Sequence, residues 1–244
     1  MAPEVSAAAL EVPHRFGEPQ AQLDWIAAHL PAAELVVLPE AALTGYVSPE
    51  GDFDLAPFAE PRGGATERAF IQLARERGCA LLAPLIERDG RSCYNAALFI
   101  DASGAVLARY RKRHPWFPES WATPGEDPPP LFGWRGFTLT IAICFDLNFL
   151  GEDAARELAQ ADALLFPSAW TERRDSRPAL LCDLARRFGC MVLNANWGVG
   201  VPRVPGQGNS MAVSASGALL DRGGPVCHAA LSRRTNTCDA SETP

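Results

Sequence analysis

Residues 137–149, with the sequence FTLTIAICFDLNF, are the stretch from which the rest of the chain can be interpreted. Residues 139–143 are short, apolar and rich in β-branched side chains, and polar residues close the run. This pattern favours a buried strand over a helix. In open α/β sheets, reactive groups gather at the carboxyl ends of strands, where a crevice opens. The stretch therefore predicts that Cys144 lies at the end of a buried strand.

The overall composition restricts the class of protein. The chain has 244 residues, of which 48% are hydrophobic, a formal net charge of -7 and a pI near 5.2. A chain of this size can bury a substantial core, so we expect one α/β domain spanning residues 1–244, with a polar tail from about residue 232. The acidic balance argues against nucleic-acid and membrane partners, because phosphate-rich surfaces attract clustered Lys and Arg. Without a membrane span or a signal sequence in view, we expect a cytoplasmic protein.

Strands and helices alternate in two stretches, and meanders follow the first and the last, so the sheets should be mixed. Helical spacing predicts helices at residues 19–30, 66–77, 151–160 and 178–188, with Thr66 as an N-cap. Strands are expected at residues 8–12, 35–39, 79–86, 94–100, 106–110, 139–143, 163–166, 191–195, 211–214, 218–220 and 226–231. Residues 47–65 and 199–208 are expected to be loops.

Cys144 is one of seven cysteines and needs a reason to be singled out. The other six lie at positions 79, 93, 182, 190, 227 and 238. No C-x-x-C pair occurs among them, so they suit neither a zinc site nor a disulfide framework, and we expect most to be reduced and buried. A nucleophilic cysteine needs a base or a cation nearby. His114, in the proline-rich loop at residues 111–130, is the only one of the four histidines that is a serious candidate.

Two other residues offer a different set of partners. Glu40 ends the apolar run at residues 35–39, as Cys144 ends its own, so partial dehydration would raise its pKa toward a value useful for proton transfer. Lys112 stands at the entrance to the long loop, and loops of this length inside compact domains are usually functional or disordered. Taken singly, an ordinary loop glutamate and a solvated lysine explain these residues as well. Their combination with Cys144 favours a catalytic set.

Three segments in chain order, LVVLPEAALTGY, YRKRHPWFPES and LTIAICFDLNF, closely resemble the catalytic signatures of the nitrilase (carbon-nitrogen hydrolase) superfamily. The resemblance runs from about the first predicted helix to about residue 222. It implies a four-layer αββα sandwich with two mixed β-sheets, no cofactor and no metal, and pairing into homodimers or higher homo-oligomers. Matched residue by residue, it implies Glu40 as the base, Lys112 as the cation, Cys144 as the nucleophile and Glu119 as a further carboxylate.

The resemblance narrows the chemistry more than the substrate. True nitrilases usually carry Trp-Glu after the cysteine, whereas Phe145-Asp146 is closer to the Tyr-Asp of amidase branches. We therefore expect hydrolysis of a small amide or N-carbamoyl compound through a cysteine thioester, with release of ammonia or an amine. Lys112 and the N–H of Phe145 would face the oxyanion. Nitrile hydrolysis, acyl transfer to an amine, and a catalytically silent relative that binds a small molecule or a partner protein are the alternatives.

Several residues are candidates for the pocket wall. One of Arg173, Arg174 and Arg177 would suit a substrate carboxylate, although a solvated basic run explains them better. The chain departs from many amidase-like relatives at Asn148, where they have Arg, and at Arg187, where they have Glu, so the substrate cannot be copied from a relative. The aromatic side chains expected in the wall are Tyr46, Trp116, Trp121, Phe145, Trp170 and Trp197.

Overall fold

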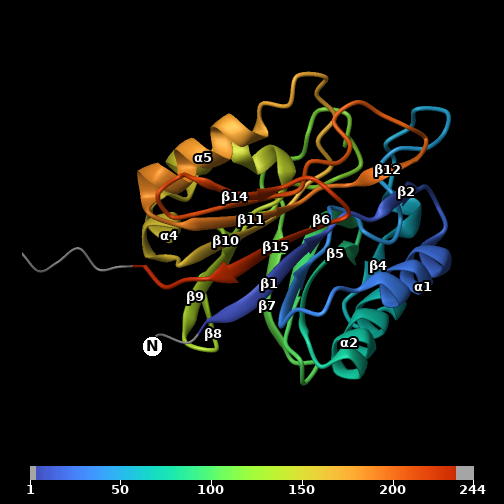
Figure 1. Cartoon of the computed structure of the whole chain (residues 1–244). Coiled ribbons are helices and arrows are strands. Elements are labelled where there is room, and N and C mark those ends of the chain that lie inside the picture. Colours follow the sequence, from blue (N-terminus) through green and yellow to red (C-terminus); the bar gives the residue numbers. More distant parts are fainter. Residues whose placement is uncertain (1–3, 235–244) are drawn as a thin grey trace, which may run out of the picture.

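The computed structural model describes residues 4–234. Within this range the strands form two large β-sheets and a small two-stranded one. The two large sheets face each other, with helices α1 (Pro19–His29) and α2 (Ala65–Arg77) covering one outer face (Figure 1). Helices α4 (Ala155–Gln160) and α5 (Arg177–Phe188) cover the other. The order helix, sheet, sheet, helix is the αββα sandwich implied by the sequence resemblance.

The first sheet is mixed. Its strands, in spatial order, are β15 (Val226–Leu231), β1 (Val5–Leu10), β3 (Leu35–Val37), β5 (Ala80–Asp89), β6 (Ser92–Ile100) and β7 (Val106–Arg111), with β4 (Glu60–Pro61) also beside β5. Strands β1, β3 and β5 are parallel, whereas β15 pairs with β1 in the antiparallel sense. Strands β5, β6 and β7 form the antiparallel meander that the sequence predicts.

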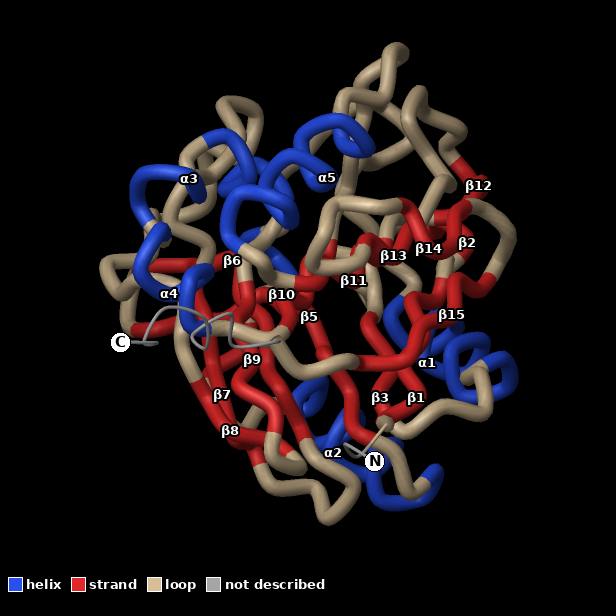
Figure 2. Tube along the Cα trace, turned by 60° about the vertical axis from the view of Figure 1, so that its left-hand side comes forward, coloured by secondary structure: helices blue, strands red, loops and turns tan. Residues whose placement is uncertain are grey.

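The second sheet is also mixed. Its strands, in spatial order, are β14 (Leu219–Arg222), β13 (Met211–Val213), β11 (Met191–Ala195), β10 (Ala163–Pro167), β9 (Phe137–Ile141) and β8 (Phe132–Trp134). The central strands β9, β10 and β11 are parallel to one another. The small sheet pairs β2 (Pro13–Arg15) with β12 (Gly198–Val201). Figure 2 shows the strands of the large sheets stacked between the helical layers.

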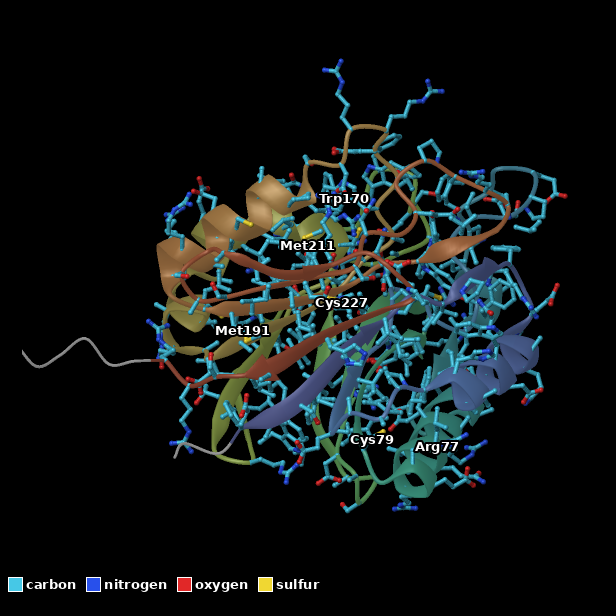
Figure 3. The ribbon with its side chains drawn as sticks, viewed as in Figure 1. Arg77, Cys79, Trp170, Met191, Met211 and Cys227 are labelled. Carbon is cyan, nitrogen blue, oxygen red and sulfur yellow. The ribbon has the colours of Figure 1, made fainter. Side chains whose placement is uncertain are left out.

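The core fills the space between the sheets and the space beneath the helices. Leu35 and Val37 of β3 pack between the sheets, while Val36 points to the side covered by α1 and α2. This alternation is the two-residue period of a strand, and it explains why β3 is apolar on both faces. Met211 of β13 and Cys227 of β15 are buried where the edges of the sheets approach each other (Figure 3).

Helix ends follow local residue chemistry. Both α2 and α5 stop at glycines in the left-handed conformation, Gly78 and Gly189, each with φ of 62°. Glycine adopts this conformation without the steric penalty of a Cβ atom. The prediction that Thr66 caps α2 is wrong, because Gly64 occupies that position. Thr66 lies one residue inside the helix, and its N–H and hydroxyl both donate to Glu60.

Two local expectations need correction. The helix expected at residues 151–160 is two short helices, α3 (Leu150–Asp153) and α4, because the backbone leaves helical geometry at Ala154. Residues 47–65 are not simply a surface loop, since Val47 and Leu55 are buried and the segment contains strand β4 and the 3-10 turn η1 (Ala56–Phe58).

The short strands β2, β8 and β12 were not predicted, because three or four residues carry too little periodicity to be recognised. The first strand was expected at residues 8–12, whereas β1 begins at Val5 and ends at Leu10. Most of the polar tail, from residue 235 onward, lies outside the described residues. Among the described helices, none is long and apolar enough to cross a membrane.

Candidate active site

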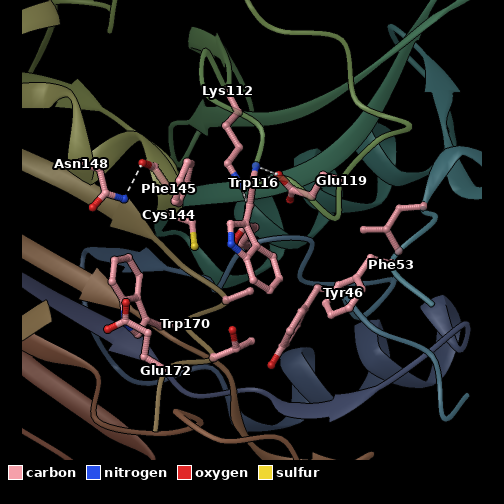
Figure 4. Close-up of a pocket in the computed structure, with 14 residues that line it drawn as sticks. Tyr46, Phe53, Lys112, Trp116, Glu119, Cys144, Phe145, Asn148, Trp170 and Glu172 are labelled. Carbon is pink, nitrogen blue, oxygen red and sulfur yellow. Dashed lines mark hydrogen bonds and ion pairs between the residues drawn. The ribbon is translucent and has the colours of Figure 1, made fainter. Parts of the chain in front are cut away.

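A pocket of about 120 Å³ opens where β3, β7, β9 and β10 end (Figure 4). Figure 4 shows the sulfur of Cys144 pointing into it, with Trp116 on one side and Trp170 on the other. The wall combines ionisable groups with aromatic rings. Eight of the ten site residues expected from the sequence line it: Glu40, Tyr46, Lys112, Trp116, Glu119, Cys144, Phe145 and Trp170.

Lys112 is held between two carboxylates. Its Nζ donates to Glu40 Oε1 at 2.7 Å and to Glu119 Oε2 at 2.8 Å, and its side chain is 1% exposed. Burial by itself lowers the pKa of Lys112, but Glu119 and Glu40 raise it, and the result lies well above the usual value. Lys112 is therefore a permanent ammonium. It is also the only lysine in the 244-residue sequence, in which every other cationic side chain of the Lys/Arg type is arginine.

The two carboxylates arrive from different parts of the chain. Glu40 follows β3, and the Trp197 indole N–H donates to its backbone oxygen at 2.7 Å. Glu119 closes a turn in the long loop, where its Oε2 accepts the Trp116 N–H at 2.7 Å. Burial raises the pKa of Glu119, Lys112 lowers it and Glu40 raises it, with a net increase. At Glu119, burial and the charge of Glu40 therefore outweigh the ammonium of Lys112.

Cys144 stands at a sharp bend between β9 and the 3-10 helix η2 (Cys144–Asn148). Its φ is 46°, in the left-handed region that costs a non-glycine residue on the order of 1–3 kcal/mol. The buried carboxylate of Asp146 supports the bend by accepting the Ile143 N–H at 3.0 Å. It also accepts the Tyr110 hydroxyl at 2.8 Å and the His114 N–H at 2.9 Å, which ties the loop after β7 to the bend.

The thiol of Cys144 is neutral at rest. Burial raises its pKa well above the usual value, and Glu40 raises it further. Lys112 and the Ala169 backbone N–H act in the opposite direction, because they favour the thiolate. A neutral thiol beside a carboxylate needs that carboxylate as a base when it attacks. The Phe145 N–H lies in the first turn of η2, where backbone donors lack acceptors within the helix.

The sequence does not single out Asn95 of β6, although Asn95 forms hydrogen bonds with Glu40, Glu119 and Lys112. Its Nδ2 donates to Glu40 Oε1 at 2.7 Å and to Glu119 Oε1 at 3.1 Å. Its backbone oxygen accepts the Lys112 N–H at 2.8 Å. It is 1% exposed, and its side-chain oxygen has no hydrogen-bond partner among residues 4–234. Asn95 lies within the YNAAL strand, whose pattern carries no signal of a site.

Replacing Asn95 by alanine is expected to lower kcat/KM by about tenfold, since a hydrogen bond to a charged group contributes about 1.5–3 kcal/mol. A donor to a carboxylate favours the ionised form, so its loss raises the carboxylate pKa and moves the acid limb of the pH profile to higher pH. Asn148→Ala is the matched control, because Asn148 lines the pocket but donates to the Phe145 oxygen. An unmoved acid limb in Asn95→Ala would show that Asn95 does not tune the carboxylates.

Two predicted wall residues lie elsewhere. Trp197 does not line the pocket: it is fully buried behind Glu40, where it packs against His14. It lies two residues beyond the end of β11, and its ring packs in the core rather than in the pocket. Trp121 likewise packs on the cluster beneath α1 and α2. The lining residues that the sequence did not place in the wall are Phe53, Leu55, Asn148, Ala169, Thr171 and Glu172.

The other charged candidates do not reach Cys144. His114 Nε2 is 2.8 Å from Asp153 Oδ2, and its ring stacks on Phe149, outside the pocket. Arg177 is fully buried and bonded to Asp175. The remaining arginines in question, Arg173, Arg174 and Arg187, are exposed and do not line the pocket. Within residues 4–234 no group of three or more His, Cys, Asp or Glu side chains is arranged to hold a metal ion.

The geometry can be compared with known proteins. A family model described as carbon-nitrogen hydrolase matches residues 6–227. The chain belongs to the carbon-nitrogen hydrolase family. Among solved structures similar to this carbon-nitrogen hydrolase is a double mutant of the amidase from Nesterenkonia sp. AN1 in complex with acrylamide, with 28% identity and a TM-score of 0.82. The match covers 95% of this chain and 93% of that one. The nitrilase-superfamily resemblance and its fold are therefore confirmed.

Curated relatives of this carbon-nitrogen hydrolase include amidases. An (R)-stereoselective amidase from Pseudomonas sp. is 34% identical over 131 residues, which are 53% of this chain and 45% of that protein. A formamidase from Allorhizobium ampelinum is 33% identical over 138 residues, 54% of this chain and 38% of that protein. A nitrilase from Pyrococcus abyssi is 33% identical over 141 residues, 56% and 52% of the two chains. The matches thus span about half or less of these relatives.

Proposed function

We propose that the protein hydrolyses the C–N bond of a small amide through a thioester on Cys144. The observation that supports this most is the buried cluster in which Lys112 bridges Glu40 and Glu119 at 2.7 and 2.8 Å, in the same small pocket as the Cys144 thiol. This set supplies a base, a fixed cation and a nucleophile, which are the groups that acyl transfer requires.

The reaction follows from these positions. Glu40 takes the thiol proton of Cys144, and the sulfur attacks the amide carbonyl carbon. Negative charge then develops on the carbonyl oxygen, which Lys112 and the Phe145 N–H stabilise. Glu40 returns its proton to the amide nitrogen, the C–N bond breaks and ammonia leaves. Water, deprotonated by Glu40, attacks the thioester, and the released thiolate of Cys144 regains the proton. Glu119 holds Lys112 in place throughout.

Several observations favour an amide over a nitrile. Phe145-Asp146 follows the cysteine, and the relatives include amidases and formamidases. The Nesterenkonia amidase has been seen with acrylamide and, in another structure, with acrylamide added at its active-site cysteine. The pocket volume of about 120 Å³ is below the usual range of drug-sized sites, so it suits a small acyl group. We also propose cytoplasmic activity by a homodimer or higher homo-oligomer without a cofactor.

A panel of small substrates tests this function. Purified protein is incubated with formamide, propanamide, pentanamide, an N-carbamoyl amino acid and propanenitrile, while released ammonia is measured. Turnover of one or more simple amides, faster than that of the nitrile, is the expected result. Turnover of propanenitrile alone would replace the proposal with a nitrilase. No ammonia from any member, together with a Cys144 inert toward iodoacetamide, would favour a catalytically silent relative.

A further inference from the structure

We propose that the natural amide carries a cationic group, such as an ammonium, which binds between the aromatic wall and Glu172 at the mouth of the pocket. This inference rests on the proposed amide hydrolysis and adds the substrate class. It is carried by three independent features of the pocket: its charge balance, its aromatic rings, and two oxygen atoms left without protein donors.

The charge balance disfavours a carboxylate-bearing substrate. Lys112 is the only cation among the fourteen lining residues, all of them in the described part of the chain. Its ammonium is already shared by Glu40 and Glu119, and Glu172 adds a further carboxylate. Even with Glu119 protonated, the carboxylates of Glu40 and Glu172 outnumber the single ammonium of the wall. A substrate anion would find no counter-ion, whereas a cation would.

The nearby arginines do not change this balance. Arg177 is fully buried, and its guanidinium is satisfied by Asp175, by Asn194 Oδ1 at 3.0 Å and by the Gly208 backbone oxygen at 3.1 Å. It cannot turn toward the pocket without abandoning these partners. Arg173 and Arg174 are exposed and outside the wall. None of these three arginines is therefore placed to bind a substrate carboxylate in the pocket.

The aromatic wall suits a cation. Tyr46, Phe53, Trp116 and Trp170 all line the pocket, and the rings of Phe53 and Trp116 meet edge to face at 5.3 Å. The faces of such rings attract ammonium groups within about 6 Å of the ring centre. A small cavity lined by these four aromatic side chains and Phe145 can therefore hold an alkylammonium chain, with its methylene groups packed on the rings and its charge at the mouth.

Two oxygens are available to the cation. Tyr46 is 6% exposed, and its hydroxyl has no partner among the described residues. In Figure 4 this hydroxyl points to the side of the pocket where Trp170 and Glu172 lie. Glu172 Oε2 accepts the Trp170 indole N–H at 3.1 Å and the Ser176 hydroxyl at 2.6 Å, which fixes the carboxylate. Both bonds fall on one oxygen, so Oε1 can accept a substrate N–H.

Three probes of nearly equal size test the proposal: pentanamide, 4-aminobutanamide, with an ammonium in place of the terminal methyl, and succinamate, with a terminal carboxylate. Their dissociation constants are measured by calorimetry on Cys144→Ala protein, in which binding is separated from turnover. We expect 4-aminobutanamide to bind about tenfold more tightly than pentanamide, and succinamate to bind most weakly. Equal or tighter binding of pentanamide or succinamate would overturn the proposal.

A second variant assigns the preference to Glu172. In Glu172→Gln, the ratio of the pentanamide to the 4-aminobutanamide dissociation constant should fall severalfold, while Asp183→Asn, which removes an exposed carboxylate from α5, should leave it unchanged. Raising the ionic strength should shrink the ratio in the parent, because Glu172 is exposed to screening ions. If the ratio were unchanged both in Glu172→Gln and at high ionic strength, the assignment of the preference to Glu172 would be wrong.

The two proposals fail in different ways. If the unmodified protein releases ammonia from pentanamide but the cation is not preferred, the amide hydrolase stands and the cationic substrate is wrong. If no amide is hydrolysed but 4-aminobutanamide still binds preferentially to Cys144→Ala, the pocket selects cations and the proposed reaction is wrong.

Discussion

Replacement of Cys144 by alanine is expected to abolish amide hydrolysis, with kcat/KM falling on the order of 10⁴-fold or more. The sulfur forms the only covalent bond to the acyl group in the proposed reaction, and Glu40 and Lys112 have no nucleophile to activate without it. The fold should survive, because alanine fills part of the same buried site and the substitution removes no hydrogen bond on which the fold depends. Ammonia release and circular dichroism on matched samples measure the two effects.

Cys190→Ala is the matched control, since Cys190 is a fully buried thiol outside the pocket. Burial raises the pKa of Cys190 to about 12, so it is an inert thiol. Its variant should keep hydrolysis within about twofold while losing some thermal stability. If Cys144→Ala turned over amides at the rate of the unmodified protein, another residue would have to be the nucleophile and the proposed mechanism would be abandoned.

Replacement of Lys112 by methionine should have the second-largest effect. Methionine keeps the length of the side chain but leaves Glu40 and Glu119 facing each other without their shared cation. Loss of one oxyanion donor lowers kcat by about 10²–10³-fold. Breaking a buried ion pair by removing one partner lowers the free energy of unfolding by about 3–5 kcal/mol. Ammonia release and urea unfolding measure the two losses separately.

Two further variants separate the effect of Lys112 on the reaction from its effect on stability. In Lys112→Met combined with Glu119→Gln, one buried negative charge is removed, so stability should partly return while activity stays low. Arg113→Met changes the neighbouring cation, which forms a partly exposed pair with Asp153 and should affect stability by less than about 1 kcal/mol. Wild-type rates in Lys112→Met would show that the ammonium is not needed for the reaction.

Much of the fold was predictable because its strands are short apolar runs with clear ends. The runs that contain Leu35–Val37 and Phe137–Ile141 are buried on both faces, and the side chains just beyond them reach the same pocket. Strand periodicity alone places Glu40 and Cys144 at strand ends. It took the resemblance to a family to join them with Lys112 and Glu119, which come from a loop without regular structure.

The rest depends on contacts that no local pattern encodes. Asn95 reaches the cluster because β6 pairs with β7, so its importance appears only in three dimensions. Trp197 resembles a pocket aromatic in sequence, yet its indole is used to hold the backbone of Glu40. Glu172 stands in a polar run of five charged residues at 172–175 and 177, and only the folded loop selects it from its neighbours.

The covalent intermediate offers the most direct measurement. The protein is mixed with 4-nitrophenyl pentanoate, whose good leaving group makes acylation fast, then quenched in acid within milliseconds to seconds and analysed by intact mass and peptide mapping. The account predicts a burst of nitrophenolate and one pentanoyl group on the peptide that contains Cys144, which disappears as hydrolysis completes. Turnover of the ester with no acyl group on Cys144, or with the acyl group on another residue, would contradict it.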